Sequence, residues 1–486
     1  MARVEDRVQP GQPGDGIAQE IPSKNLPPVP YRDLPEPLPL KKIVGASVIL
    51  LATSIGSGEF VLWPFIASQV GLVAMWAALV GITIQYFINM EIERYTLATG
   101  ETAVTGFTRL WKGWAPLFII MTVVPWAWPG WATGASTSLS YVFGWSEDAV
   151  VPVTVVGLLA IGIALTVSPV VYQTVEKFQM VMVAIIVVFL VVAVVIATDG
   201  SHWGDFATGF SNFGSIPSEI GAATLLGALA FAGAGGSVNL AQSNWIRDKG
   251  MGMGGAMPRI VSPFTGEEVS RATTGFFFRQ TPENMSRWNA WWKVSSQEQF
   301  WTFLVIGGLS IIILSVLTYA TVFGREGLTD DFSFIQLEGE VLKDTIAPWF
   351  GSSFWIAGTV ILLSTNLGVI DHVGRVVADV LKVNWLRDNE FWSESKLYFA
   401  LVWGEIAFGC IILLAGVTQP LVLLVIASSL NGIVMFVYSG LLLQLNRGVL
   451  PAPIQMKGLR LVMLGISTLF FGYFSVQVVI DQFGQL

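Results

Sequence analysis

KIVGASVILLATSIGSGEFVLWPFI, residues 42–66, is long and apolar enough to cross a bilayer as a helix. Its middle carries Gly56, Ser57 and Gly58, and the acid Glu59 follows at once. Because glycine weakens a helix, this triplet predicts a local unwinding at mid-depth. Backbone N–H and C=O groups released there cannot face lipid, so they must face protein or a polar cavity.

A second stretch, residues 219–245, has the same character. It is apolar up to Phe231, reads AGAGGS over residues 232–237, and then carries Asn239. Two glycine-interrupted spans in corresponding halves are the pattern that marks the substrate site of a secondary transporter. The pair therefore predicts broken helices 1 and 6 in two inverted repeats of five helices.

The composition places the chain among membrane proteins. Its 486 residues are 53% hydrophobic and only 12% charged. The single cysteine, Cys410, excludes an intramolecular disulfide and a cysteine metal cluster. The sequence has no basic stripe for nucleic acid, no nucleotide-binding glycine loop and no metal-hydrolase motif, so neither a nucleic-acid partner nor an enzyme is predicted.

Hydropathy and span length predict an all-α integral membrane protein with eleven transmembrane helices. The predicted spans are 42–67, 70–92, 115–142, 149–168, 172–197, 218–245, 299–323, 349–373, 396–416, 418–443 and 459–481. The predicted organisation is a disordered cytosolic tail (1–40), a first half with helices 1–5 (41–197), an outer loop and broken helix 6 (198–246), a cytosolic basic and aromatic loop (247–298), helices 7–10 (299–443), and an inner loop with helix 11 (444–486).

Lys and Arg gather in alternate loops, and the loops on the other side hold only Arg325 and Lys343. By the positive-inside rule this predicts a cytosolic N-terminus and an external C-terminus, in a cell (inner or plasma) membrane. The expected partners are the lipid bilayer and a small solute or ion. A monomer is expected, with an oligomer as the alternative.

Two cytosolic segments carry weaker predictions. Residues 1–40 are rich in Pro, Gly, Asp and Glu, which predicts an extended or disordered tail. In the loop 247–298, Trp288, Trp291 and Trp292 lie beside Arg287 and Lys293, a pattern typical of an amphipathic helix at the bilayer interface. A structural brace is the expected role of this loop, and regulation is the alternative.

Several motifs resemble the Nramp family (natural resistance-associated macrophage proteins). Residues 85–111, QYFINMEIERYTLATGETAVTGFTRLW, are similar to the family's stretch with Thr-Gly-Lys-Asp-Leu. VEKFQ at residues 175–179 is similar to its Arg-Lys-Leu-Glu, Asn239 keeps an Asn-Leu pair, and Asn431 matches a polar Gln that faces the site. The resemblance implies a leucine-transporter-type (LeuT) fold and transport of a divalent metal.

The chain departs from the family where the metal binds. Residues 56–59 stand in place of the family's Asp-Pro-Gly-Asn, and residues 236–238 in place of its Met-Pro-His. Trp128 and Trp131 lie near the positions of the third-span acids used in proton movement. The resemblance therefore implies a divergent branch, similar to Nramp-related magnesium transporters and without the family's proton coupling.

Losing the thioether removes the feature that favours softer metals, so a bound cation should be hard and held by oxygen. Mg²⁺ is the expected cargo, with Mn²⁺ as a second option, and no cofactor is expected. The candidate metal ligands are Glu59, Asn239 and Asn431. The candidate substrate-binding residues are Gly56, Ser57, Gly58, Glu59, Gly233, Gly235, Gly236, Ser237, Asn239 and Asn431.

An opposite interpretation stays open. Glycine-rich starts of half-helices present N–H groups and a positive dipole end, which suit an anion. Gly-Ser-Gly followed by Phe60 also resembles the first span of amino acid–polyamine–organocation transporters. A small carboxylate, an amino acid or an inorganic anion is therefore the alternative cargo. A channel and a non-transporting sensor are further hypotheses.

Overall fold

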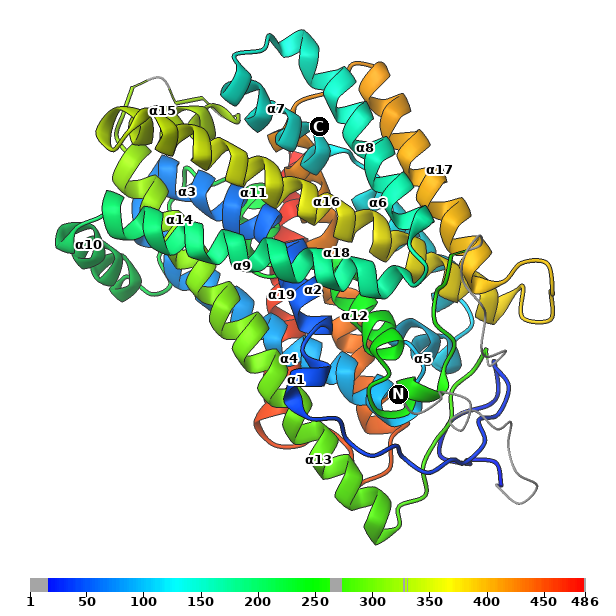
Figure 1. Cartoon of the computed structure of the whole chain (residues 1–486). Helices are drawn as coiled ribbons and strands as arrows, with labels where there is room; N and C mark the ends of the chain where they lie inside the picture. The colour runs from blue at the N-terminus through cyan, green and yellow to red at the C-terminus, as the bar shows by residue number, and fades with distance from the viewer. Residues whose placement is uncertain (1–15, 263–272, 327, 330, 485–486) are drawn as a thin grey trace.

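The computed structural model describes residues 16–262, 273–326, 328–329 and 331–484, and every regular element within these ranges is a helix (Figure 1). Nine helices in this part of the chain are long and apolar enough to cross a membrane. The first of them, Ala46–Thr99, contains two predicted spans, and the predicted span 218–245 is divided into two shorter helices. Each of the eleven predicted spans therefore has a helical counterpart, which confirms an all-α membrane fold.

The helices follow the predicted spans in order. The first half consists of α1 (Leu40–Ile43), α2 (Ala46–Ser54), η2 (Ile55–Leu62), α3 (Trp63–Val70), η3 (Gly71–Ala74), α4 (Met75–Thr99), α5 (Ala103–Leu110), α6 (Trp114–Trp126), α7 (Gly130–Phe143), η4 (Glu147–Ala149), α8 (Val150–Val167) and α9 (Val171–Ala197). The second half consists of α10 (Gly200–Ser211), α11 (Ala222–Ala230), α12 (Gly236–Lys249), η5 (Gly252–Ala256), α13 (Pro282–Gln299), η6 (Phe300–Ile306), α14 (Gly307–Val322), α15 (Ser333–Thr345), α16 (Pro348–Asn384), α17 (Glu394–Leu414), α18 (Pro420–Gly448) and α19 (Leu459–Gly484).

Local sequence explains where many helices start and stop. Pro occupies the first turn of α13, α16 and α18, where its missing N–H has no helical partner to lose. α4 ends at Gly100 and α12 ends at Gly250, and both glycines adopt positive φ angles, 71° and 80°. Gly100 thus ends helix 2, and Gly250 ends the inner half of helix 6.

Helix 1 changes form at the glycine triplet but does not unwind. Residues Ile55–Leu62 form a π-helix between two α-helical segments. A wider helical turn keeps backbone groups bonded inside the helix, which removes the need for a polar cavity to receive them. The carbonyl groups that we expected to be free near Gly56 therefore belong to a helical backbone.

Helix 6 is broken as predicted. Residues 231–235 separate α11 from α12, and Gly233 and Gly235 adopt φ angles of 118° and 73°. Such angles strain any residue with a Cβ atom, so the glycines permit this break. A further interruption between α6 and α7 was not predicted, although Pro125 and Pro129 flank it.

The prediction of a disordered tail was wrong for the described residues 16–40. Ala18, Ile21, Val29 and Leu34 are fully buried, and the segment pairs by backbone hydrogen bonds with itself and with Phe277. The Pro-rich composition hides this order, because the segment is held by the rest of the chain and not by regular structure of its own. Residues 1–15 lie outside the described residues.

The aromatic part of the loop 247–298 is helical, but it is the inner extension of helix 7. α13, η6 and α14 run on as one helix, Pro282–Val322, so helix 7 begins seventeen residues before the predicted boundary at 299 (299 − 282). Trp288 and Trp291 are buried, and Trp291 Nε1 donates a hydrogen bond of 2.8 Å to the carbonyl of Pro35. The tryptophans pack against protein and so do not mark a separate interfacial helix.

α16 is the central packing element, with α2, α6, α7, α12 and α17 against it. In Figure 1 α13 projects at the lower end of the helical bundle, away from α7 and α8 at the upper end. We call the end that carries α13 the inner end, following the orientation predicted from the basic loops.

Candidate functional site

The centre of the bundle is the place where the π-helical turn of helix 1 meets the break in helix 6. A Cβ atom on Gly58 would lie 1.5 Å from the carbonyl oxygen of Phe231, and one on Gly56 would lie 2.4 Å from Oγ1 of Thr365 in α16. The glycines therefore serve close backbone packing at helix 1. On the other side of the break, a Cβ on Gly236 would lie 1.7 Å from Oδ1 of Asn431 in α18.

Gln85 of α4 satisfies the broken backbone of helix 6. Its Nε2 donates hydrogen bonds to the carbonyls of Leu229 (3.3 Å), Ala230 (2.8 Å) and Ala232 (2.8 Å). Its Oε1 accepts from the N–H of Gly235 at 3.0 Å and from Nδ2 of Asn239 at 3.3 Å. Three of the carbonyls near Gly233 are thus already bonded, and the break is built around this glutamine.

An aromatic cluster lines the helix 6 break. The rings of Trp126 and Trp131 stack with centroids 5.1 Å apart, and Trp126 stacks on Phe231 at 5.3 Å. Trp131 Nε1 donates a 2.7 Å hydrogen bond to Oγ of Ser57. The tryptophan at the position of a family acid therefore links helix 3 directly to helix 1.

His372 of α16 is the site residue that sequence reasoning missed. It is fully buried, its ring packs edge-on against Trp126 at 4.8 Å, and its Nε2 lies 3.2 Å from Oγ of Ser237. Its place in the sequence, beside the charged Asp371 and Arg375, favoured an interfacial residue. The signal that could have found it is its position one helical turn beyond Gly368, which packs against Thr53 of helix 1.

Glu59 faces away from the aromatic cluster. Ser54 Oγ donates a 2.8 Å hydrogen bond to Oε1 of Glu59, and a Cβ on Gly307 of α14 would lie 4.0 Å from the same oxygen. Oε2 is buried and receives no hydrogen bond from any described residue. The carboxylate thus lies between helices 1 and 7 with one oxygen available.

The other two candidate metal ligands share this feature. Asn239 donates through Nδ2 to the hydroxyl of Tyr438 (3.0 Å), and Asn431 donates through Nδ2 to the carbonyl of Ala427 (3.0 Å). Among the described residues neither Oδ1 atom finds a hydrogen-bond donor, and both are buried. A buried oxygen without a donor is costly, so helices 1, 6 and 10 each carry an acceptor that a cation or an ammonium group would satisfy.

Ser364 and Thr365 in the middle of helix 8 make contacts between helices. Thr365 Oγ1 accepts from the N–H of Gly56 at 3.0 Å and donates to the carbonyl of Ala52 at 3.1 Å. Ser364 Oγ donates to Oε1 of Gln179 at 2.6 Å. In the described residues no group of three or more His, Cys, Asp or Glu side chains could hold a metal.

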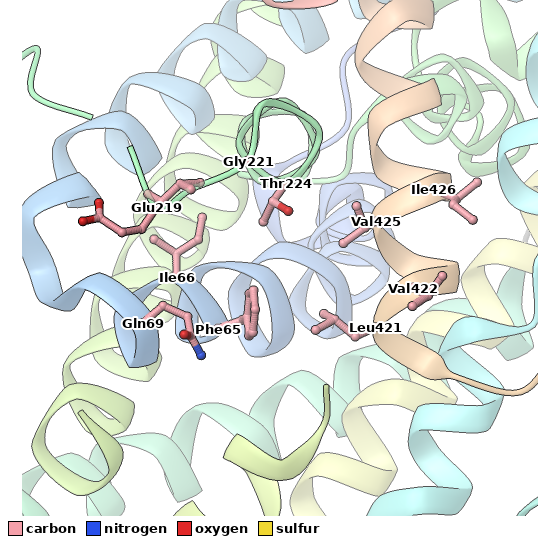
Figure 2. A pocket seen from close by; sticks show the side chains of 11 residues that line it. Phe65, Ile66, Gln69, Glu219, Gly221, Thr224, Leu421, Val422, Val425 and Ile426 are labelled. Atoms are coloured by element: carbon pink, nitrogen blue, oxygen red, sulfur yellow. The ribbon is translucent and has the colours of Figure 1, made fainter. Parts of the chain in front are cut away.

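An outer cavity of about 460 Å³ lies above the buried centre (Figure 2). Its walls come from α3, α11 and α18, and they are Phe65, Ile66, Gln69, Glu219, Ile220, Gly221, Thr224, Leu421, Val422, Val425 and Ile426. Below it, α11 packs closely on α18, where a Cβ on Gly227 would lie 2.2 Å from Oγ of Ser428. The centre is therefore closed off from this cavity.

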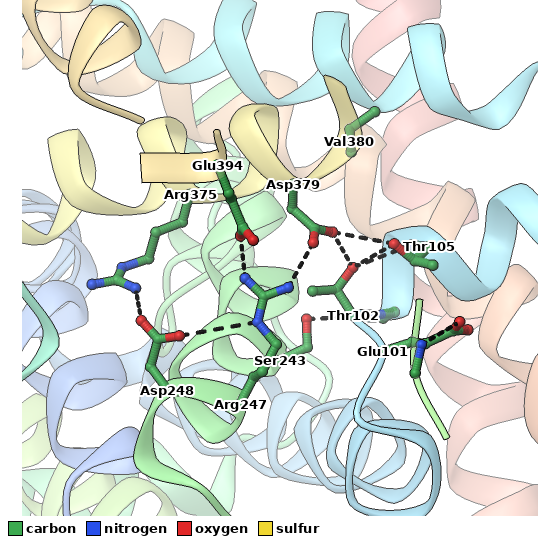
Figure 3. Close-up of polar contacts among 12 residues, drawn as sticks. Glu101, Thr102, Thr105, Ser243, Arg247, Asp248, Arg375, Asp379, Val380 and Glu394 are labelled. Carbon is green, nitrogen blue, oxygen red and sulfur yellow. Dashed lines mark hydrogen bonds and ion pairs between the residues drawn. The ribbon is translucent and has the colours of Figure 1, made fainter. Parts of the chain in front are cut away.

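Buried ion pairs close the inner end (Figure 3). Arg247 of α12 pairs with Asp379 of α16 at 2.7 Å and with Glu394 of α17. Arg375 pairs with Asp371, one helical turn earlier in α16, at 2.7 Å, and it also pairs with Asp248. These pairs join the inner half of helix 6 to helices 8 and 9.

Comparisons with known proteins support the fold. A mutant of the Eremococcus coleocola manganese transporter matches with a TM-score of 0.64 at 12% identity, over 91% of this chain and 87% of that chain. The same transporter in complex with an aromatic bis-isothiourea substituted compound matches at 0.61 and 12%, over 96% and 91%. MhsT in complex with L-phenylalanine matches at 0.52 and 15%, over 88% and 98%.

No family model and no curated protein sequence matches this chain. The structural likenesses show that the chain has the leucine-transporter-type fold, in agreement with the prediction. At these identities they do not extend to the cargo.

Proposed function

We propose that this protein is a secondary transporter of a divergent Nramp-related branch, which moves a hard divalent cation by alternating access. Mg²⁺ is the preferred cargo and Mn²⁺ the second. The observation that carries the proposal is the set of three buried oxygens without donors, on Glu59, Asn239 and Asn431. Their helices meet at the break of helix 6, and alternating access moves these helices relative to one another.

The chemistry of the three groups favours a hard ion. They supply only oxygen, with one carboxylate among them, and Mg²⁺ is bound through one or two carboxylates while it keeps several waters. A neighbour in fold is named as a manganese transporter, and Mn²⁺ is the second cargo of this proposal. By the resemblance, Trp131 lies near the position of a third-span acid of the family, and here it is bonded to Ser57, so transport without that coupling is part of the proposal.

A second candidate cargo is a small carboxylate or amino acid. The specific observation in its favour is the aromatic wall of Trp126, Trp131 and Phe231 at the start of α12. The first N–H groups of a helix and its dipole favour a carboxylate, and aromatic rings favour an apolar body. A neighbour in fold, MhsT, was solved with L-phenylalanine.

The test is uptake into proteoliposomes of Mg²⁺, Mn²⁺, Ca²⁺, small carboxylates and amino acids, with wild type and Glu59→Gln. We expect saturable divalent uptake that falls about tenfold or more in Glu59→Gln, because a charge-assisted ligand is lost. Glu405→Gln is the matched control, since Glu405 is also in mid-span but lies on α17, away from both breaks. It should transport like wild type.

The other outcomes are also informative. Uptake of an amino acid or a carboxylate without divalent flux would reject the cation and support the second candidate. A large, unsaturable conductance would indicate a channel. If no solute moves and the reconstituted protein is folded, the transporter proposal fails.

A further inference from the structure

Residues 16–36, which we call the N-terminal strap, form a folded segment across the inner end. Ala18 N–H donates to the carbonyl of Val29 (2.9 Å), and Tyr31 N–H donates to the carbonyl of Gly16 (3.0 Å), which closes a hairpin. Phe277 N–H then donates to the carbonyl of Pro30 at 3.0 Å. The strap is thus joined to the loop that leads into α13.

Arg109 of α5 clamps the strap. Its Nη1 donates hydrogen bonds to the carbonyls of Pro22 (2.7 Å) and Pro27 (3.0 Å). Its Nε and Nη2 bind both oxygens of Glu101, at 2.7 and 2.6 Å. Asn25 Nδ2 adds hydrogen bonds of 3.1 Å to the carbonyls of Thr108 and Arg109. Each of the three nitrogens of the buried guanidinium therefore bonds to the strap or to Glu101.

Glu101 keeps its charge in this setting. Burial alone would raise the pKa of Glu101, but the Arg109 guanidinium, the N–H of Gly275 and the hydroxyl of Tyr95 together hold the pKa below its ordinary value. The ion pair therefore persists at neutral pH, where it anchors the strap to the start of α5.

The clamp continues into the inner ion network. Thr102, next to Glu101, donates a 2.6 Å hydrogen bond to Oδ2 of Asp379, and Thr105 donates to the same oxygen at 3.2 Å. The other carboxylate oxygen of Asp379 accepts from Arg247 at 2.7 Å. Figure 3 shows these contacts running between α5, α16 and α12. The strap is thus connected, through α5, to the carboxylate of Asp379, which pairs with Arg247 and so joins helix 8 to helix 6.

The far end of the strap reaches helix 1 through α13. Arg287 donates to the carbonyl of Leu34 at 2.9 Å, and the N–H of Leu34 donates to Oδ1 of Asn284 at 3.1 Å. The same continuous helix 7 carries Glu298, which accepts from the N–H groups of Gly45 and Ser47 at 3.3 Å and so caps the start of α2. The strap therefore contacts α13, which is continuous with the residue that caps helix 1, and α5, which is bonded to the ion pairs of helix 6.

We propose that the N-terminal strap is a built-in brake that stabilises the closed state of the inner end and sets how often it opens. The proposal rests on the alternating access proposed above. Inner opening requires the inner halves of helices 1 and 6 to leave α16 and α13. While the strap is docked, that movement also strains the Arg109 clamp and the contacts of Leu34.

The test measures inner opening directly, without cargo. Ser243→Cys in a Cys410→Ser background places one thiol on α12, where Ser243 is fully buried and accepts a hydrogen bond from the N–H of Ala103 at 3.3 Å. A membrane-impermeant maleimide is applied from the inner side. Deleting residues 2–36 should raise the labelling rate about tenfold, since several buried hydrogen bonds of about 1 kcal/mol each are lost. Deleting residues 2–15, which keeps the strap, should not.

A single substitution guards against a folding defect in the deletion. Leu34→Asp buries a carboxylate under the strap and should release it, with a similar rise in labelling. Ser23→Asp adds the same charge at an exposed strap position and should label like wild type. Unchanged labelling in folded Leu34→Asp and in the 2–36 deletion would overturn the brake. Because labelling does not depend on cargo, the brake and the proposed function can fail separately.

Discussion

Gly58→Ala should abolish transport and lower the stability of the folded protein by about 3 kcal/mol or more, as expected for severe overpacking. The added Cβ would lie 1.5 Å from the carbonyl oxygen of Phe231 and 2.4 Å from its carbonyl carbon. Both are backbone atoms, so no side-chain rotation relieves the clash. Helix 1 and the break of helix 6 would have to separate, and the site between them would lose its geometry.

Gly404→Ala is the matched control for this substitution. Gly404 lies in α17 with nothing within 4 Å of an added Cβ, and alanine is the better helix former by about 1 kcal/mol. The control should be neutral or slightly more stable in thermal unfolding in detergent, and it should transport normally. Normal uptake by Gly58→Ala would show that the two backbones are not in contact as described.

Much of this fold was predictable because a bilayer leaves few solutions. Only helices satisfy their backbone in lipid, so apolar run length gave all eleven spans. The position of both glycine segments was also readable, since a glycine cluster in a span has few other uses. The conformation of the first glycine segment could not be predicted. Whether residues 55–62 unwind or form a π-helix depends on how closely Phe231 and Thr365 approach them, and this is a property of the tertiary structure.

Sequence reasoning proposed the candidate site as a list of residues and could not give their arrangement. Glu59, Asn239 and Asn431 do keep available oxygens, but the sequence could not tell that Glu59 turns toward Ser54 and Gly307. Helical position alone leaves the direction of a side chain open around a π-helical turn. His372 was undervalued for a related reason, because its partners Trp126 and Ser237 come from helices 3 and 6.

The strap shows the limit of composition as a guide. Residues 16–36 contain too few apolar side chains for a core of their own. They are ordered because Arg109, Arg287 and Trp291 present donors to their carbonyls and side chains elsewhere cover Leu34. A Pro-rich segment exposes carbonyl groups that have no helical partners, and such groups are ready acceptors for fixed donors on a neighbouring surface.

Gln85→Leu should have the second large effect, because it removes all five hydrogen bonds that hold the helix 6 break. The leucine has a similar volume, so the loss is polar. The carbonyls of Ala230 and Ala232 and the N–H of Gly235 would lose the partner that Gln85 gives them, at about 1–3 kcal/mol each, whereas the carbonyl of Leu229 still accepts from the N–H of Ala232. We expect loss of uptake together with a lower unfolding temperature. Gln85→Glu should behave almost as badly, since a carboxylate has no N–H to give to the carbonyls of Ala230 and Ala232.

Gln179→Leu is the control that distinguishes the effect of losing Gln85 at the helix 6 break from the general loss of stability on removing a buried glutamine. Gln179 is equally buried and makes two hydrogen bonds with Ser364 between α9 and α16, away from both glycine segments. Its substitution should lower stability by about 1–3 kcal/mol and leave cargo affinity unchanged. If Gln85→Leu lost no more uptake than Gln179→Leu at matched stability, the break would not depend on Gln85. Its geometry would then have to come from the positive φ angles of Gly233 and Gly235 alone.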